Sequence, residues 1–131
     1  MGALGAFSTM VGGRSVAAAG MTSKSATEEG IDFVVGEVTT ANRHPGHLPG
    51  SVPNMKIKLL FRRDNDQVIG GHVSGGEAAS DMVNIIATAI QANLTANQLA
   101  VMQYATHPLL TASPLNYHVM LAAENAAVKL S

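Results

Sequence analysis

The most regular pattern in the chain is an alternation of apolar and basic residues in KIKLLFR, residues 56–62. Ile57, Leu59 and Phe61 lie on one face and Lys56, Lys58 and Arg62 on the other, and Leu60 is the exception. This alternation has the period of a strand with one buried face. RDNDQ (63–67) has turn-forming residues, and VIGGHV (68–73) resumes the strand pattern. We therefore predict a β-hairpin over residues 56–73 with one face in the core and one in water.

The segment after this hairpin has the spacing of an amphipathic helix. Ser74 and Glu77 stand three residues apart, as in a capping box that opens a helix. Apolar residues then recur at intervals of three and four, namely Ala79, Met82, Val83, Ile86, Ala89 and Ile90. This stripe is expected to cover the sheet.

A short helix is expected next, because Thr95 and Gln98 repeat the capping-box spacing. Its inward-facing residues would be Leu99 and Met102. Beyond it, YATHPLLTASP (104–114) contains turn-forming residues and predicts a loop.

The last predicted helix has Ser113 as its N-cap and Pro114 as its first residue, and runs to about Val128. One stripe holds Leu115, Val119, Ala122 and Ala126, and Met120, Leu121 and Val128 widen it. A stripe this wide predicts a helix that is buried on two sides.

The N-terminal part has weaker signals. Residues 1–12 are small and glycine-rich, which favours a linker or chain start. RSVAAAG (14–20) predicts a short strand, and Thr22 can cap a brief helix that Gly30 ends in the left-handed conformation. IDFVVGEVTT (31–40) is apolar on both faces and predicts a central strand.

The order of these elements indicates the fold class. Strands come first, a proline-rich loop over residues 41–54 interrupts them, and helices make up the C-terminal half, with no alternation of strand and helix. We predict an α+β fold with an antiparallel sheet covered by helices. At 131 residues and 47% hydrophobic, the chain fits a single domain over residues 13–131.

Composition excludes several classes of function. A formal net charge of -1 without a basic stripe argues against nucleic acid as a partner. The absence of cysteine rules out disulfides, thiolate metal sites and a cysteine nucleophile within this chain. No apolar run is long enough for a membrane span, and no export signal is recognisable, so a cytoplasmic location is expected. The low charged fraction, 13%, favours self-association.

Three candidate sites have a simpler structural explanation. The loop in GGHVSGGE lacks the phosphate-binding spacings, and we expect Gly70 and Gly71 to allow close helix packing instead. His44, His47 and His72 lack a carboxylate at ligand spacing, so no metal site is predicted. Ser113 beside His107 lacks a nucleophile elbow and an orienting acid, which disfavours a hydrolase.

His107 is the strongest candidate for chemistry. Pro108 disfavours the α region for His107 and fixes the chain beyond it, so the imidazole projects from a stiff, extended segment between two helices. The alternative is that Pro108 ends a helix and His107 is an ordinary half-exposed residue. The residues alone leave both interpretations open.

Several motifs in collinear order resemble one known family. The hairpin ending in IGGHVSGG, the helix AASDMVNIIATAIQANLT and the His-Pro loop resemble the C-terminal dimerisation domain of the FAD-dependent pyridine nucleotide-disulfide oxidoreductases. VAAAGMTSKSATEEGIDFVVG and RHPGHLPG are similar to its NADH oxidase and coenzyme A-disulfide reductase-like branch. The likeness covers roughly residues 14–128 and implies the dimerisation-domain fold of FAD/NAD-linked reductases.

This resemblance implies a role for the His-Pro loop. In relatives of the glutathione reductase type, the corresponding histidine reaches into the active site of the other subunit as an acid-base group, and here that residue is His107, positioned by Pro108. Those relatives place a glutamate shortly after the histidine, whereas LLTASP supplies none. His107 could therefore transfer protons or shape the flavin pocket.

The resemblance also implies partners. The parent protein would carry FAD- and NAD-binding domains, use FAD and NAD(P)H and form a homodimer, while this chain alone, which has no dinucleotide fingerprint, should be inactive. The alternative is a free-standing interaction or assembly module with the same fold and no redox role. The sequence does not identify the electron acceptor.

Overall fold

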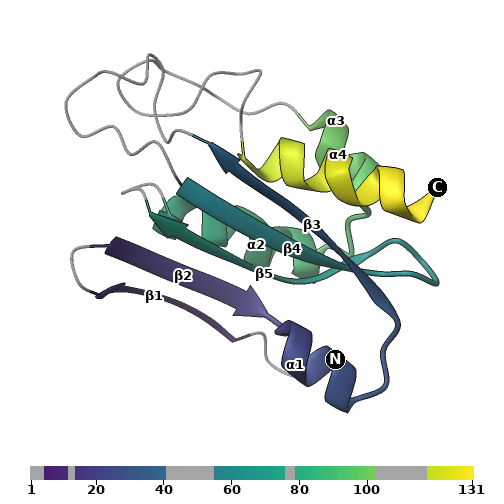
Figure 1. Ribbon diagram of the computed structural model, residues 1–131, viewed down its shortest axis with the longest axis horizontal. Helices are drawn as coiled ribbons and strands as arrows, with labels where there is room; N and C mark the ends of the chain where they lie inside the picture. The colour runs from purple at the N-terminus through teal and green to yellow at the C-terminus, as the bar shows by residue number, and fades with distance from the viewer. Residues whose placement is uncertain (1–4, 12–13, 41–54, 76–78, 103–117) are drawn as a thin grey trace.

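The computed structural model describes residues 5–11, 14–40, 55–75, 79–102 and 118–131 (Figure 1). Its strands are β1 (Ala6–Val11), β2 (Arg14–Gly20), β3 (Phe33–Thr40), β4 (Met55–Arg62) and β5 (Val68–Gly75). Its helices are α1 (Ser23–Glu28), α2 (Ala79–Gln91), α3 (Ala96–Val101) and α4 (His118–Leu130). The strands form one sheet in the order β1-β2-β5-β4-β3, and every neighbouring pair is antiparallel. The predicted α+β class is confirmed.

The predicted hairpin is strands β4 and β5. Ile57 lies opposite Val73 and Leu59 opposite Gly71, and Ile57, Leu59 and Val73 are fully buried. The register shifts between Leu60 and Phe61, where a bulge interrupts the pairing. The alternation in the sequence therefore predicted both the hairpin and its buried face.

Two helices cover the same face of the sheet, and a row of residues across three strands shows why they fit. Gly36 on β3, Leu59 on β4 and Gly71 on β5 are paired in register, so their Cα positions face the same side. A Cβ at Gly36 would collide with the carbonyl oxygen of Ala122 in α4, and one at Gly71 would lie 3.1 Å from Ile86 in α2. The two glycines let α4 and α2 approach, and Leu59 fills the space between them.

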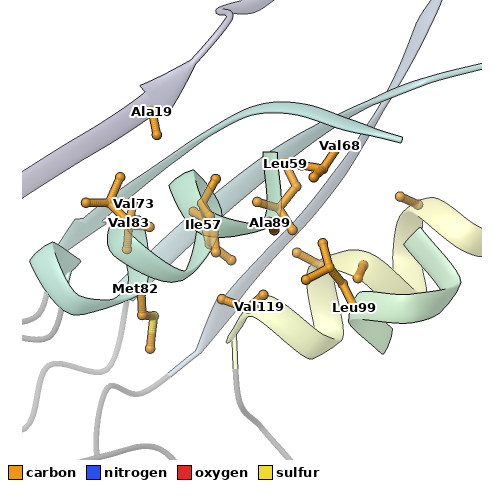
Figure 2. Close-up of a cluster of buried hydrophobic side chains, with 14 of the residues drawn as sticks. Ala19, Ile57, Leu59, Val68, Val73, Met82, Val83, Ala89, Leu99 and Val119 are labelled. Atoms are coloured by element: carbon orange, nitrogen blue, oxygen red, sulfur yellow. The ribbon is translucent and has the colours of Figure 1, made fainter. Parts of the chain in front are cut away.

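The core lies between this face and the helices, as Figure 2 shows. The stripe predicted for α2 is buried at each position that can be assessed: Met82, Val83, Ile86, Ala89 and Ile90. The stripe predicted for the last helix is likewise buried at Val119, Ala122 and Ala126. Both helices therefore pack by the spacing visible in the sequence.

The expectation that residues 31–40 form a central strand is wrong. In the described sheet β3 is an edge strand, paired only with β4. Two of its backbone groups are bonded by α4: Asn125 Oδ1 accepts a hydrogen bond from the Glu37 N–H (3.2 Å), and Lys129 Nζ donates to the Val35 carbonyl (2.7 Å). The strand is apolar on both faces although it is an edge strand, and α4 rather than another strand covers its free side.

The N-terminal segment also differs from expectation. Residues 1–12 were expected to be a linker, but Ala6–Val11 form strand β1, paired with β2 from Ala6 opposite Ala19 to Val11 opposite Arg14. AFSTMV includes the β-forming residues Phe, Thr and Val, and β2 offers a free edge that β1 extends. The glycines around this segment favour a linker, so the sequence did not predict this six-residue strand.

The predicted caps of α1 and α3 are confirmed. Thr22 accepts a hydrogen bond from the Ser25 N–H (3.0 Å), and Ser25 Oγ accepts one from the Thr22 N–H (3.0 Å). Gly30, with a φ of 74°, follows α1 in the left-handed conformation. Short helices such as these depend on their caps because they contain few internal hydrogen bonds.

The face of the sheet turned away from α2 and α4 is here called the open face. It carries Val16, Ala18, Val35, Glu37, Lys56, Lys58, Leu60 and His72. Gly70 lies on this side too, where a Cβ would collide with the carbonyl oxygen of Met21. The expectation that Gly70 serves helix packing is therefore wrong, whereas it is confirmed for Gly71, which faces Ile86.

Candidate functional site

The helix that leads into the His-Pro loop is fixed to the hairpin. Thr95 caps α3, accepting from the Gln98 N–H (3.2 Å), and Gln98 Oε1 accepts from the Thr95 N–H (2.9 Å). The Ala96 N–H donates to the carbonyl of Asp66 (3.0 Å), so the first residue of the helix is joined to the β4–β5 turn. Leu99 is buried and holds the helix in the core.

The end of α3 is apolar and exposed. Val101 is 78% exposed and Met102 37% exposed, and Met102 has an extended backbone (φ -62°, ψ 146°) that ends the helix. The expectation that Met102 lies inside is wrong, because the chain turns away from the helix at this residue. Two exposed apolar side chains thus lie five and six residues before His107 in the chain.

The predicted site residues themselves, His107 and Pro108, lie outside the described residues. Ser113 and Pro114, the expected start of the last helix, lie outside them as well. The described part of α4 begins at His118, which is completely buried. The segment that holds His107 is therefore flanked by α3 on one side and by a buried helix start on the other.

His118 is a residue that the sequence analysis overlooked. It is buried at the sheet-facing side of α4, together with Val119, which is fully enclosed. The available signal was its spacing, since His118 precedes Ala122 by one helical turn and so shares the buried side of α4. A buried polar side chain thus lies in the first described turn of α4.

The prediction that Val128 widens a stripe buried on two sides is wrong. Val128 is 75% exposed, whereas Met120 and Leu121 are half-buried. The reason is that α4 lies along the edge of the sheet, so one of its sides faces away from the core. Exposed valines at the ends of α3 and α4 leave apolar surface on the two helices, which pack against each other.

His72 is the histidine that the structure describes on the sheet. It is half-buried on the open face, paired in register with Lys58. Burial lowers the pKa of His72, and the positive charges of Lys58 and Lys56 lower it further. His44 and His47 lie outside the described residues, and within the described ranges no three His, Asp, Glu or Cys side chains come together as metal ligands.

The glycine-rich loop after β5 is only partly described. Ser74 belongs to β5 itself, and Glu77, its expected capping partner, lies outside the described residues.

None of the helices that the structure describes is long and apolar enough to cross a membrane.

Together these features define an α+β module: a five-stranded antiparallel sheet with helices packed on one face and a His-Pro segment between its last two helices. The model of the family described as "Pyridine nucleotide-disulphide oxidoreductase, dimerisation domain" matches residues 7–116. The chain belongs to this family, which confirms the resemblance found in the sequence.

Individual relatives support the same family assignment. The chain is 30% identical over 121 residues to an NADH oxidase from Methanocaldococcus jannaschii, covering 92% of this chain and 26% of that protein. A NAD-dependent persulfide reductase from A. fulgidus superimposes with a TM-score of 0.85 at 26% identity, over 98% of this chain and 23% of the other. The CoA-disulfide reductase-like structure CoADR-RHD from Bacillus anthracis gives 0.84 at 26% identity, over 95% and 22%. The chain thus spans about a quarter of the length of these proteins.

Proposed function

We propose that this chain is the dimerisation domain of an FAD-dependent NAD(P)H oxidoreductase. In the proposal, residues 13–131, extended by β1, act as a single unit that forms the interface of a homodimer. The segment with His107 and Pro108 contributes to the flavin site of the partner subunit. FAD and NAD(P)H belong to the remainder of the parent protein, whose FAD- and NAD-binding domains are the further partners, and a cytoplasmic location remains a prediction.

The observation that carries the proposal is the exposed apolar end of α3. Val101 and Met102 are exposed to water there although both side chains are apolar. An apolar surface immediately before the His107 segment supports an interface there, because burying it against a second subunit would remove it from water. The relatives described above are oxidoreductases, and they do not favour the free-standing module.

His107 has two possible tasks at such an interface. As a proton carrier it would need a pKa near the working pH and a partner that orients the imidazole, and a carboxylate of the other subunit could replace the glutamate missing after Pro108. As a pocket-shaping residue it would change the surroundings of the flavin without exchanging protons. FAD would supply the hydride and electron chemistry in either case.

A chimera tests the proposal. This chain would replace the matching quarter of the Methanocaldococcus jannaschii NADH oxidase, and dimer mass, bound FAD and NADH oxidation would be measured. If His107 carries protons, His107→Ala should lower kcat by about a hundredfold or more and remove one limb of the pH profile. If it shapes the pocket, His107→Ala should shift the flavin absorbance spectrum and leave the pH profile unchanged.

The matched control is Asn97→Ala, an exposed position on α3 that should leave all three readouts unchanged. A chimera that binds FAD as a monomer would contradict the dimerisation role. A dimeric, active chimera whose kcat, pH profile and flavin spectrum ignore His107→Ala would contradict the site assignment alone.

A further inference from the structure

The open face carries an excess of positive charge that the described residues do not balance. Lys58 pairs with Glu37 across the strands, at a loose 3.9 Å. Arg62, at the end of the same strand, is held by Asp64 through two hydrogen bonds of 3.0 and 2.9 Å. Lys56 makes no ion pair with any residue that the structure describes. Two lysines therefore face one described carboxylate, that of Glu37, with His72 beside them.

A hollow of about 270 Å³ lies on this face beside Lys58. It is lined by small or apolar residues, including Ala18 and Leu60, by Thr22 and Ser23 at the start of α1, and by Lys58 and His72. The His72 imidazole makes no hydrogen bond to the part of the chain that the structure describes. An acceptor that entered the hollow would face both His72 and Lys58, which line it.

Apolar side chains also remain partly accessible on the open face. Leu60 is buried within the chain itself, whereas Val16 and Val35 are only half-buried. A mixed surface of this kind, with an apolar centre and charged neighbours, is typical of an interface between folded parts of a protein. The chain spans 26% of the NADH oxidase relative, so about three quarters of such a protein is available to cover it.

We propose that the open face is the docking surface for the remaining part of the parent protein, and that it receives an acidic patch there. One carboxylate of that patch would enter the hollow and accept hydrogen bonds from His72 and Lys58, and a second would face Lys56. Complementary charge fits the unbalanced lysines, and the carboxylate supplies the acceptor that His72 lacks. This inference rests on the proposed function, because it requires a parent with further domains.

Lysine footprinting tests the surface directly. The isolated chain and the full-length chimera with the NADH oxidase would be treated with an amine-acetylating reagent, and the modification rate of each lysine measured by mass spectrometry. Lys56 and Lys58 should react about tenfold more slowly in the chimera, which corresponds to docking worth about 1.4 kcal/mol. Lys129, exposed on α4 at the helix-covered side of the sheet, is the internal control and should react at the same rate in both.

A charge reversal tests the acidic character of the partner surface. Lys56→Glu should bring the reactivity of Lys58 in the chimera back toward its rate in the isolated chain, whereas Lys129→Glu, on α4, should not. Equal labelling of Lys56 and Lys58 in the isolated chain and in a dimeric, FAD-bound chimera would overturn this inference and leave the proposed function intact. Protection that survives Lys56→Glu would overturn the acidic partner, and a chimera that neither dimerises nor binds FAD would overturn both proposals.

Discussion

The two faces of the sheet are built on different physical principles, although the same strands supply both. On the helix-covered face, Gly36, Leu59 and Gly71 alternate in size across the sheet so that α4 and α2 fit closely. On the open face, the adjacent row pairs His72 with Lys58 and Lys58 with Glu37. Packing density stabilises the first face, whereas the charges of the second face are only loosely paired within the described residues.

The largest expected effect comes from the centre of the helix-covered face. Leu59→Ala should lower the free energy of unfolding by about 3–4 kcal/mol, because Leu59 is fully buried between the two helices. Leu60→Ala, one residue along on the open face, should cost about 2 kcal/mol, the low end for a buried leucine, since the hollow beside it lets the site collapse or admit water. Urea unfolding followed by circular dichroism measures both. Equal losses would show that the two faces do not differ in packing.

A glycine on the same face gives the next effect. Gly36→Ala should lower the free energy of unfolding by about 2–3 kcal/mol, because the new Cβ meets the Ala122 carbonyl and lies 2.8 Å from the Ala126 side chain. Gly5→Ala is the control, since nothing lies within 4 Å of its Cβ position. The same denaturation assay compares them. A stable Gly36→Ala protein would mean that α4 does not pack against β3 as described.

The hydrogen bonds at the edge of β3 should contribute less to the free energy of unfolding. Asn125→Ala removes the acceptor for the Glu37 N–H and should cost about 1 kcal/mol, since the group can still bond to water. Glu124→Ala, on the neighbouring exposed position of α4, should change stability by less than about 0.5 kcal/mol. Light scattering should also show more aggregation for Asn125→Ala, because the freed strand edge can pair with another chain.

The smallest effect is the pH dependence that His72 adds to the open face. Its pKa in the folded chain lies below the ordinary 6.5, through burial and then through Lys58 and Lys56, so the unfolded chain binds the proton more readily. The stability contributed is therefore present above about pH 6.5 and lost as the pH falls through the lowered pKa of the folded state. His72→Gln should flatten the curve of unfolding free energy against pH in this window. If His72→Gln leaves the pH dependence of the unfolding free energy unchanged, the imidazole of His72 is exposed to water in the folded chain.

The two faces also differ in how well the sequence predicts them. Alternation in KIKLLFR identified the hairpin and its buried side, and helical spacing identified the stripes of α2 and α4, because burial imposes a period on the residues. The position of β3 at the edge could not be predicted this way. An apolar strand is typical of the sheet centre, and only the fold shows that Asn125 and Lys129 of α4 occupy its free side.

Prediction of the site succeeded only in part. The family was recognised from collinear motifs, and the capped helix before the His-Pro loop was found from Thr95 and Gln98. The exposure of Val101 and Met102 could not be read from composition, because apolar residues at the end of a helix usually indicate core. Exposed apolar residues look like core residues in a sequence, and only the structure distinguishes the two. The role of His107 stays a prediction.

The most direct test of the account is the mass of the chain in solution, measured by sedimentation equilibrium over a range of concentrations. The account predicts a species of twice the 13.5 kDa chain mass, and predicts that Val101→Glu, which adds a charge to the apolar end of α3, shifts it toward the monomer. Asn84→Glu, the same charge on the exposed side of α2, should leave the dimer intact. A mass of 13.5 kDa at every concentration would contradict the claim that this chain is a dimerisation domain that associates through its helices.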